Sequence, residues 1–211
     1  MTSDQLEAEP DYAATVFGDT IDVARAFTAN LAARGEELGL IGPLELPRLW
    51  SRHIVNSALV AAELGPGRVG DVGSGAGLPG LVLAIARPDV SFVLIEPMER
   101  RTTWLNSQVA ELGLSNVEVV RARAEEYPTL TLDQVTARAV SALKKLIPMT
   151  APLLVDGGRL VLLKGASVEN EIDAARKQIK QFLLSDVAVK TLGDGLTPET
   201  TRIFTASVRA A

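Results

Sequence analysis

Beyond Gly67 the chain alternates between segments with the pattern of a strand and segments with the pattern of a helix. Short apolar runs predict strands at residues 68–72, 91–96, 117–121, 133–140 and 158–164, and two more at 185–191 and 201–209. Helices are predicted at residues 79–87, 99–112, 142–154 and 168–183, with Pro148 bending or interrupting the third. Repeated strand-then-helix units are typical of an α/β fold with a mostly parallel sheet and helices on both faces. Only residues 193–198 separate the last two strands, so we predict that this terminal pair is antiparallel.

Before that point the chain has the apolar spacing of helices. One predicted helix ends near Gly35 and Gly39, and its buried face carries Phe17, Ile21, Ala24, Phe27 and Leu31. A second begins at Pro47 and runs to about Leu64, with Leu49, Ile54, Ala58 and Ala62 on one side. We therefore predict a helical extension over residues 1–66, packed on a sheet domain over residues 67–211.

The composition narrows the chemistry. At 211 residues and 47% hydrophobic, the chain is long and apolar enough for one folded domain. It has no cysteine and one histidine, His53, so disulfides, thiolate nucleophiles and clusters of histidine ligands are excluded. The first residues are acidic and polar, unlike a signal peptide, and no apolar run is long enough to span a bilayer. We expect a cytoplasmic protein that needs no metal.

The sharpest motif is Asp71-Val72-Gly73-Ser74-Gly75-Ala76-Gly77, between the first predicted strand and its helix. Its glycines allow a tight turn and the close approach of a ligand to the backbone. A dinucleotide fingerprint fails because Leu78 stands at the sixth position, and a Walker loop would need Gly-Lys-Ser or Gly-Lys-Thr. A glycine turn with a purely structural role is the alternative.

The pattern D-x-G-x-G-x-G resembles motif I of class I S-adenosylmethionine-dependent methyltransferases, which have a Rossmann-like fold. Glu96 ends the second predicted strand, where an acid can accept hydrogen bonds from ribose hydroxyls. We expect Asp71 to face the amino-acid end of that cofactor.

Longer strings point to one family. They are Leu49-Trp50-Ser51-Arg52-His53-Ile54, Asp71 to Gly80 with Leu78-Pro79-Gly80, Arg123-Ala124-Glu125, Ala137-Arg138-Ala139-Val140 and Leu162-Leu163-Lys164-Gly165. Together they closely resemble the glucose-inhibited division protein B family over about residues 15–209. The resemblance implies methyl transfer from S-adenosylmethionine to N7 of one guanosine (G527 in customary numbering) of 16S rRNA, with S-adenosylhomocysteine as the product. It departs at Gly39-Leu40-Ile41-Gly42, where much of the family has an Asn-Leu-Thr-like string.

Roles carry over position by position as expectations from this resemblance. The cofactor would be held by Asp71, Gly73, Ser74, Gly75, Gly77, Leu78, Glu96, Ala124, Glu125 and Arg138. Arg138, Lys164 and Arg123 would act at the reacting centre. The 16S rRNA or the small ribosomal subunit would be bound by Arg52, His53, Arg123, Lys164 and Arg202. We expect a monomer.

The chemistry suits a chain with so few catalytic side chains. Guanine N7 has an available lone pair and no proton to lose, so its attack on a sulfonium methyl needs alignment rather than a general base. Arginine can bind guanine O6 and leave N7 facing the methyl group. His53 either positions RNA or the N-terminal helix or is a satisfied structural residue. Trp50 and Trp104 either stack a base or belong to the core.

Two other functions stay open from the residues alone. The chain would methylate another RNA or a small molecule, or it would be a ribosome-assembly module that kept the fold without the chemistry. The net charge of −5 does not exclude RNA, because the acidity is local. Residues 1–37 carry eight acids and two bases, whereas residues 38–211 carry eighteen acids and nineteen bases. A nearly neutral catalytic part predicts that non-specific RNA binding is weak and that binding is directed to one defined site.

Overall fold

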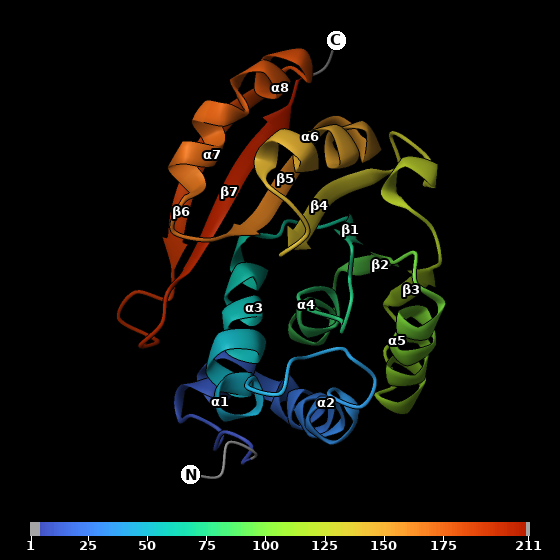
Figure 1. Cartoon of the computed structure of the whole chain (residues 1–211), viewed down its shortest axis with the longest axis vertical. Helices are drawn as coiled ribbons and strands as arrows, with labels where there is room; N and C mark the ends of the chain where they lie inside the picture. The colour runs from blue at the N-terminus through green and yellow to red at the C-terminus, as the bar shows by residue number, and fades with distance from the viewer. Residues whose placement is uncertain (1–4, 210–211) are drawn as a thin grey trace.

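The computed structural model describes residues 5–209 and has a mixed sheet at its centre (Figure 1). Within those residues the sheet has seven strands in the order β3-β2-β1-β4-β5-β7-β6. The strands are β1 Arg68–Val72, β2 Ser91–Ile95, β3 Val117–Val120, β4 Leu132–Arg138, β5 Leu154–Lys164, β6 Leu184–Leu192 and β7 Thr201–Val208. The first five are parallel, and β7 lies antiparallel between β5 and β6. The predicted fold class, including the terminal antiparallel pair, is confirmed.

The central strands are buried on both faces because each alternates its side chains between two cores, whereas the edge strands β3 and β6 are only partly buried. On β2, Phe92 and Leu94 join one core while Val93 and Ile95 join the other. The first core packs against α4 (Gly80–Ala86) and α5 (Glu99–Glu111), and the second against α6 (Leu143–Thr150). Figure 1 shows these helices on opposite sides of the sheet.

Two predicted helices are irregular. The segment predicted at 168–183 is two helices, α7 (Val168–Ala174) and α8 (Arg176–Gln181), which meet at the buried Ala175. The segment predicted at 142–154 is α6, which contains Pro148, followed by the 3-10 turn η6 (Ala151–Leu153). The proline removes one backbone donor, and the α-helix ends two residues later.

The N-terminal helices α1 (Tyr12–Phe17) and α2 (Ile21–Arg34), joined by the 3-10 turn η1 (Gly18–Thr20), pack against the first core. Phe17, Ala24, Phe27 and Leu31 are buried there together with residues of α4 and α5, whereas Ile21 is only partly buried. Figure 1 shows α1 and α2 below α4, on the same side of the sheet as α5.

The second N-terminal helix is not the regular one that the spacing predicts. The chain forms the 3-10 turn η2 (Leu46–Arg48), the π-helix η3 (Leu49–Val55), a short α3 (Asn56–Ala58) and the 3-10 turn η4 (Leu59–Glu63). Leu49, Ile54 and Ala58 are buried as predicted, but Ala62 is exposed. The angle between successive side chains changes where the π-helix gives way to a 3-10 turn. A buried face predicted at 3.6 residues per turn therefore no longer holds at Ala62, near the end of the segment.

Candidate active site

The glycine turn lies at the carboxyl end of β1, the edge where open α/β sheets bind ligands. Gly73, Gly75 and Gly77 have φ angles of 72°, 56° and 95°, which side chains rarely adopt. A Cβ added at Gly73 would lie 2.9 Å from Val140 Cγ2, and one at Gly77 would lie 2.5 Å from Leu81 Cδ1. At Gly75 it would meet nothing closer than Gly73 O at 3.8 Å. The turn is therefore closed on its protein side and open at Gly75.

Two acids stabilise this turn from inside the molecule. Glu96 is buried, and its carboxylate accepts hydrogen bonds from the N–H groups of Gly75 and Met98, each at 3.0 Å. Arg101 Nη1 lies 3.7 Å from the same carboxylate. Glu96 thus stands beside the open part of the turn, where its remaining lone pairs can accept further donors.

Asp71 is buried beneath the glycine turn, and its expected place at the amino-acid end of the cofactor stays a prediction. Its side chain is fully buried, and Oδ2 accepts a hydrogen bond from Gly80 N at 3.0 Å, while Oδ1 has no partner among the described residues. The Asp71 carboxylate can be buried here because Gly80 has no side chain. A Cβ at Gly80 would lie 2.4 Å from Asp71 Oδ2. Burial raises the pKa of Asp71 to about 7, against the opposing effect of the hydrogen bond from Gly80 N.

The other predicted cofactor residues surround the same edge. Ser74 is buried, and its hydroxyl donates to Asp71 O at 2.9 Å. Leu78 is partly buried against the first core. After β3, the 3-10 turn η5 (Ala124–Glu126) buries Ala124 and exposes Glu125.

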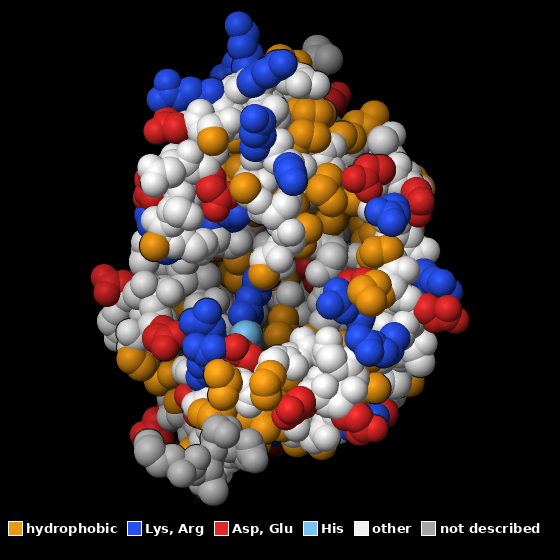
Figure 2. Space-filling view, in the orientation of Figure 1, with side chains coloured by type: hydrophobic (Ala, Val, Ile, Leu, Met, Phe, Trp, Pro, Cys, Tyr) orange, Lys and Arg blue, Asp and Glu red, His pale blue; other side chains and the backbone are white. Residues whose placement is uncertain are grey.

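A second feature of this edge is a hollow of about 480 Å³ beyond β4, β5 and β7. Figure 2 shows a hollow near the middle of this face, with the histidine and Lys or Arg side chains inside it. Four of the residues predicted to act on RNA or at the reacting centre contribute to its lining, which consists of Arg52, Asn56, Arg138, Ala139, Leu163, Lys164, Gly165, Ala166, Glu199, Thr200, Thr201 and Arg202.

Arg123 does not line this hollow, and its role at the reacting centre and toward RNA stays a prediction. It is exposed at the turn that follows β3, whereas Lys164 ends β5, and β2, β1 and β4 separate these two strands in the sheet. Its N–H group donates to Glu126 Oε2 at 3.0 Å.

The glycine turn and the hollow meet at the end of β4. Val140, which limits the space at Gly73, follows Ala139, which lines the hollow. Ala139 has a φ angle of 54°, a left-handed conformation that is unfavourable for alanine. Such strain is found where surrounding structure holds a functional segment in place. Arg138, Ala139 and Val140 therefore connect the two parts of the edge.

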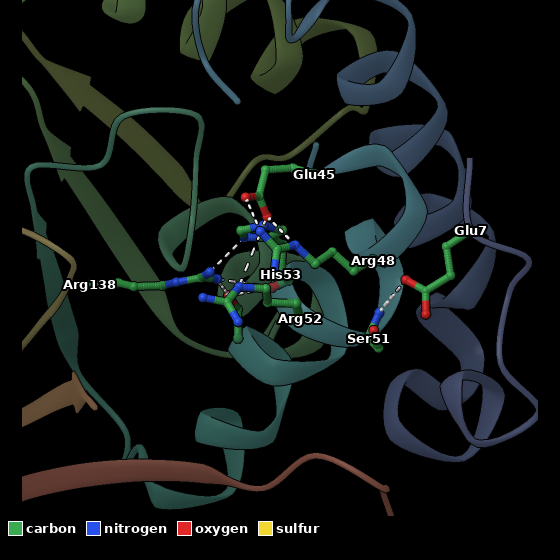
Figure 3. A network of polar contacts seen from close by, with 8 residues as sticks. Glu7, Glu45, Arg48, Ser51, Arg52, His53 and Arg138 are labelled. Carbon is green, nitrogen blue, oxygen red and sulfur yellow. Dashed lines mark hydrogen bonds and ion pairs between the residues drawn. The ribbon is translucent and has the colours of Figure 1, made fainter. Parts of the chain in front are cut away.

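Arg138 is held by the π-helix (Figure 3). Its Nη1 donates to His53 O at 3.3 Å and to Ser57 Oγ at 3.1 Å, and its Nη2 lies 2.5 Å from His53 Nδ1. The other ring nitrogen of His53, Nε2, lies 2.5 Å from Glu45 Oε2. Arg48 in turn donates to both oxygens of Glu45, at 2.6 Å and 3.0 Å.

The charge of Arg138 has no direct counter-ion. Among residues 5–209, no carboxylate oxygen lies within 4.0 Å of its guanidinium. Burial, and then the charge of Arg52, lower the pKa of Arg138 to about 10, against the opposing charge of Glu45. Burying a cation without a counter-ion is costly, so such a group is typical of a site that receives an anion or an acceptor.

The other cations of the hollow have acidic partners nearby. Lys164 forms a largely buried ion pair with Glu171 at 2.7 Å and donates to Ser141 O at 3.0 Å. Arg202 pairs with Glu169 and donates to Ala166 O at 2.9 Å. Arg52 is about half exposed and lies 4.0 Å from Glu45. Arg138 therefore differs from its neighbours.

Both tryptophans belong to the core. Trp50 and Trp104 are buried, and Trp104 Nε1 donates to Ala76 O at 2.9 Å in the glycine turn.

At the segment that departs from the family pattern, a Cβ on Gly39 would lie 3.0 Å from Arg100 Nη2. That segment therefore packs close to α5.

The sequence interpretation missed residues that hold Arg138 and residues that line the hollow. Glu45, which contacts His53, lies in an irregular loop without a motif, and Ser57, which accepts from Arg138, lies beyond the Arg52-His53 string. Thr201 is brought to Asn56 by β7, where its hydroxyl donates to Asn56 O at 3.0 Å. No local pattern marks these residues. The spacing of Ser57, four residues after His53, is the one signal that would have placed it near that residue.

The sheet order, the glycine turn after β1 and the acid after β2 together define the class I methyltransferase architecture. A SAM-dependent O-methyltransferase from Thermotoga maritima superposes with a TM-score of 0.56 at 18% identity, covering 74% of this chain and 65% of the other. The tRNA (m1A58) methyltransferase TrmI from Aquifex aeolicus gives 0.58 at 14% identity, covering 74% and 69%. At such identities the likeness concerns the fold alone.

Sequence comparison identifies the family. The family model GidB, described as rRNA small subunit methyltransferase G, matches residues 20–199. Proteins named ribosomal RNA small subunit methyltransferase G are 67% identical in Leifsonia xyli (98% of this chain, 100% of the relative) and 65% identical in Clavibacter michiganensis (96% and 97%). A relative of the same name from Corynebacterium glutamicum is 46% identical over 92% of this chain and 90% of its own length. The chain belongs to the rRNA small subunit methyltransferase G family.

Proposed function

We propose that this protein transfers a methyl group from S-adenosylmethionine to N7 of one guanosine of 16S rRNA, at position 527 in customary numbering. Arg138 carries the proposal, because it is a half-buried cation without a carboxylate partner among residues 5–209, between a glycine turn and an open hollow. The family membership supports an rRNA substrate for such a site.

The residues at the carboxyl edge fit the cofactor. The turn of Gly73, Ser74, Gly75 and Gly77 with Leu78 leaves space at Gly75, and the Glu96 carboxylate beside it can accept ribose hydroxyls. We assign the adenine to the surface near Ala124 and Glu125, and the reactive end to Arg138. Asp71 contributes indirectly, because its buried carboxylate holds the first turn of α4.

When bound, the cofactor supplies a methyl group on a positively charged sulfur. The guanine N7 lone pair forms the new N–C bond while the C–S bond breaks, and its electron pair stays on sulfur to give S-adenosylhomocysteine. No proton moves, so the protein's task is to orient the base. Arg138 is placed to donate to guanine O6, which leaves N7 free. A bound base also develops positive charge, so we expect the guanidinium to lie in the plane of the base rather than over it.

The two segments of the chain divide this task. We infer that residues 67–211 carry the cofactor, whereas within residues 1–66 Arg52 lines the RNA side of the hollow and His53 contacts Arg138 behind it. Arg52 and Arg202 stand at the hollow as phosphate contacts. Lys164 has a supporting role, because its ion pair with Glu171 fixes the end of β5.

We further propose a cytoplasmic monomer that needs no metal. No helix within residues 5–209 is long and apolar enough to cross a membrane. The large apolar side chains that are exposed lie in separate loops and turns, namely Leu6, Leu44, Met98, Leu130, Leu183 and Leu196. A displacement by a neutral nitrogen lone pair requires no Lewis acid.

The test uses small ribosomal subunits from a strain that lacks the gene. The purified protein and labelled S-adenosylmethionine should add one methyl group to 16S rRNA, and mapping should place it at N7 of one guanosine. Incorporation at another atom or in another RNA would correct the substrate. The proposal is refuted if naked rRNA, subunits and assembly intermediates all fail to incorporate the label. It is also refuted if a small molecule competes for the methyl group while no RNA is methylated.

A further inference from the structure

Among residues 5–209 no carboxylate accepts a hydrogen bond from Arg138, and the ring nitrogen Nδ1 of His53 takes that place. The Arg138 guanidinium never accepts a hydrogen bond and stays charged, so the 2.5 Å contact with His53 Nδ1 requires an unprotonated Nδ1. A neutral imidazole carries its proton on the other nitrogen. That nitrogen, Nε2, lies 2.5 Å from Glu45 Oε2, which is an acceptor.

Glu45 is itself fixed. Arg48 donates to both of its oxygens, and the hydrogen bonds from Arg48 and His53 lower the pKa of Glu45 despite its partial burial. The Glu45 carboxylate therefore selects the Nε2–H tautomer of His53, and that tautomer presents Nδ1 to Arg138.

We propose that Glu45 and His53 are positioning residues, which orient the Arg138 guanidinium through a neutral imidazole. The proposal rests on the proposed function, in which Arg138 contacts the reacting base. Protonation of His53 would place an N–H group against the guanidinium and release Arg138 from this orientation.

The charged groups that face His53 are Glu45, Arg48, Arg52 and Arg138, from the loop before η2, from η2, from η3 and from β4. Burial and the charge of Arg138 lower the pKa of His53, against the opposing effect of Glu45. The imidazole thus stays neutral to a lower pH than an ordinary histidine. Activity should fall only as the pH drops through this lowered value.

The first test needs no substrate. His53 is the only histidine of the chain, so its imidazole signals in a nitrogen–proton NMR spectrum of the whole protein are unambiguous. We expect the Nε2–H tautomer, a pKa below 6.5, and a further fall in Glu45→Gln. Glu118→Gln is the matched control, since Glu118 pairs with Arg68 on an exposed surface at the amino end of the strands. A Nδ1–H tautomer, or a pKa at or above 6.5, would overturn the proposal.

The second test separates positioning from folding. Asparagine places its side-chain oxygen near the location of Nδ1, whereas leucine offers no acceptor. Relative to the wild type, His53→Leu should lower kcat by about 100-fold, the loss that follows a misplacement of about 1 Å. His53→Asn should recover most of this activity and lose the acid limb of the pH profile.

Cofactor affinity, measured by calorimetry, should change little in either variant. Equal loss of activity in His53→Asn and His53→Leu, or wild-type activity in both, would overturn the positioning role. If the wild type itself transfers no methyl group to rRNA, the proposed function fails, whereas the NMR result still decides the tautomer.

Discussion

The glycine turn and the hollow are neighbours at one edge of the sheet, but they are built in opposite ways. Residues 71–96 supply the turn and both of its acids, with buried carboxylates held by backbone N–H groups. The hollow collects residues from position 52 to position 202, and its central group, Arg138, is a half-buried cation that no carboxylate of the described residues pairs with. The first half is a local motif, and the second is a product of tertiary folding.

This difference means that the two halves should fail differently. A substitution in the turn should remove ligand binding outright, because the backbone itself is the binding surface. A substitution in the hollow should reduce the rate more than the cofactor affinity, because side chains there chiefly orient the second reactant.

The largest effect is expected from Gly73→Asp. The added Cβ would lie 2.9 Å from Val140 Cγ2 at a φ of 72°, and its carboxylate would repel that of the cofactor. We expect cofactor affinity to fall by more than about 100-fold in calorimetry. Gly157→Asp is the control, since Gly157 has a similar φ of 77° with nothing within 4 Å. Unchanged affinity in Gly73→Asp would place the cofactor elsewhere.

The next effect is the loss of rate in Arg138→Ala. We expect methyl transfer to fall by about 100-fold, the usual order for losing one donor to the transition state. Its melting temperature should change less than that of Lys164→Ala, which breaks the ion pair with Glu171. A variant of Arg138 that loses stability and activity together would instead identify a structural arginine.

A pH-dependent effect should distinguish the buried acid of the glycine turn. Asp71 titrates near pH 7 in the fold, whereas an unfolded Asp titrates near about 4. Between these values the folded state binds more protons, so stability relative to Asp71→Asn should fall as the pH rises from about 4 to about 7. Urea unfolding of both proteins across this interval measures the difference. A difference that does not vary with pH would mean that Asp71 is ionised throughout.

The smallest effect concerns the margin of the hollow. Lys144 and Lys145 are exposed at the start of α6, three and four residues after Ser141, whose carbonyl holds Lys164. Replacing both with glutamine should weaken RNA binding a few-fold and reduce the salt dependence by about one phosphate contact each. Filter binding across a salt series measures both. Arg68→Gln, at the amino end of the strands, is the control. If the lysine variant has the same salt dependence as this control, the two lysines do not contact RNA.

The same division explains what the sequence could predict. Strand patterns and the glycine string are local, so the sheet, its antiparallel pair and the placement of Gly73 and Glu96 followed from them. The π-helix η3 has no sequence pattern that marks it, so the predicted buried face of that segment was wrong at Ala62. Glu45 reaches His53 only through tertiary packing. Arg138 was found through the family resemblance, but only the structure shows that no carboxylate within residues 5–209 pairs with it.

One contact has a consequence for how the protein is made. Thr201 Oγ1 donates to Asn56 O, so the wall of the hollow joins a residue in the first third of the chain to one near its end. On the ribosome the glycine turn and β2 emerge long before β7. A nascent chain can thus shape the cofactor turn early, while the hollow stays incomplete until residues 201–208 have left the exit tunnel. Competence to modify RNA would then be acquired only after β7 has joined the sheet.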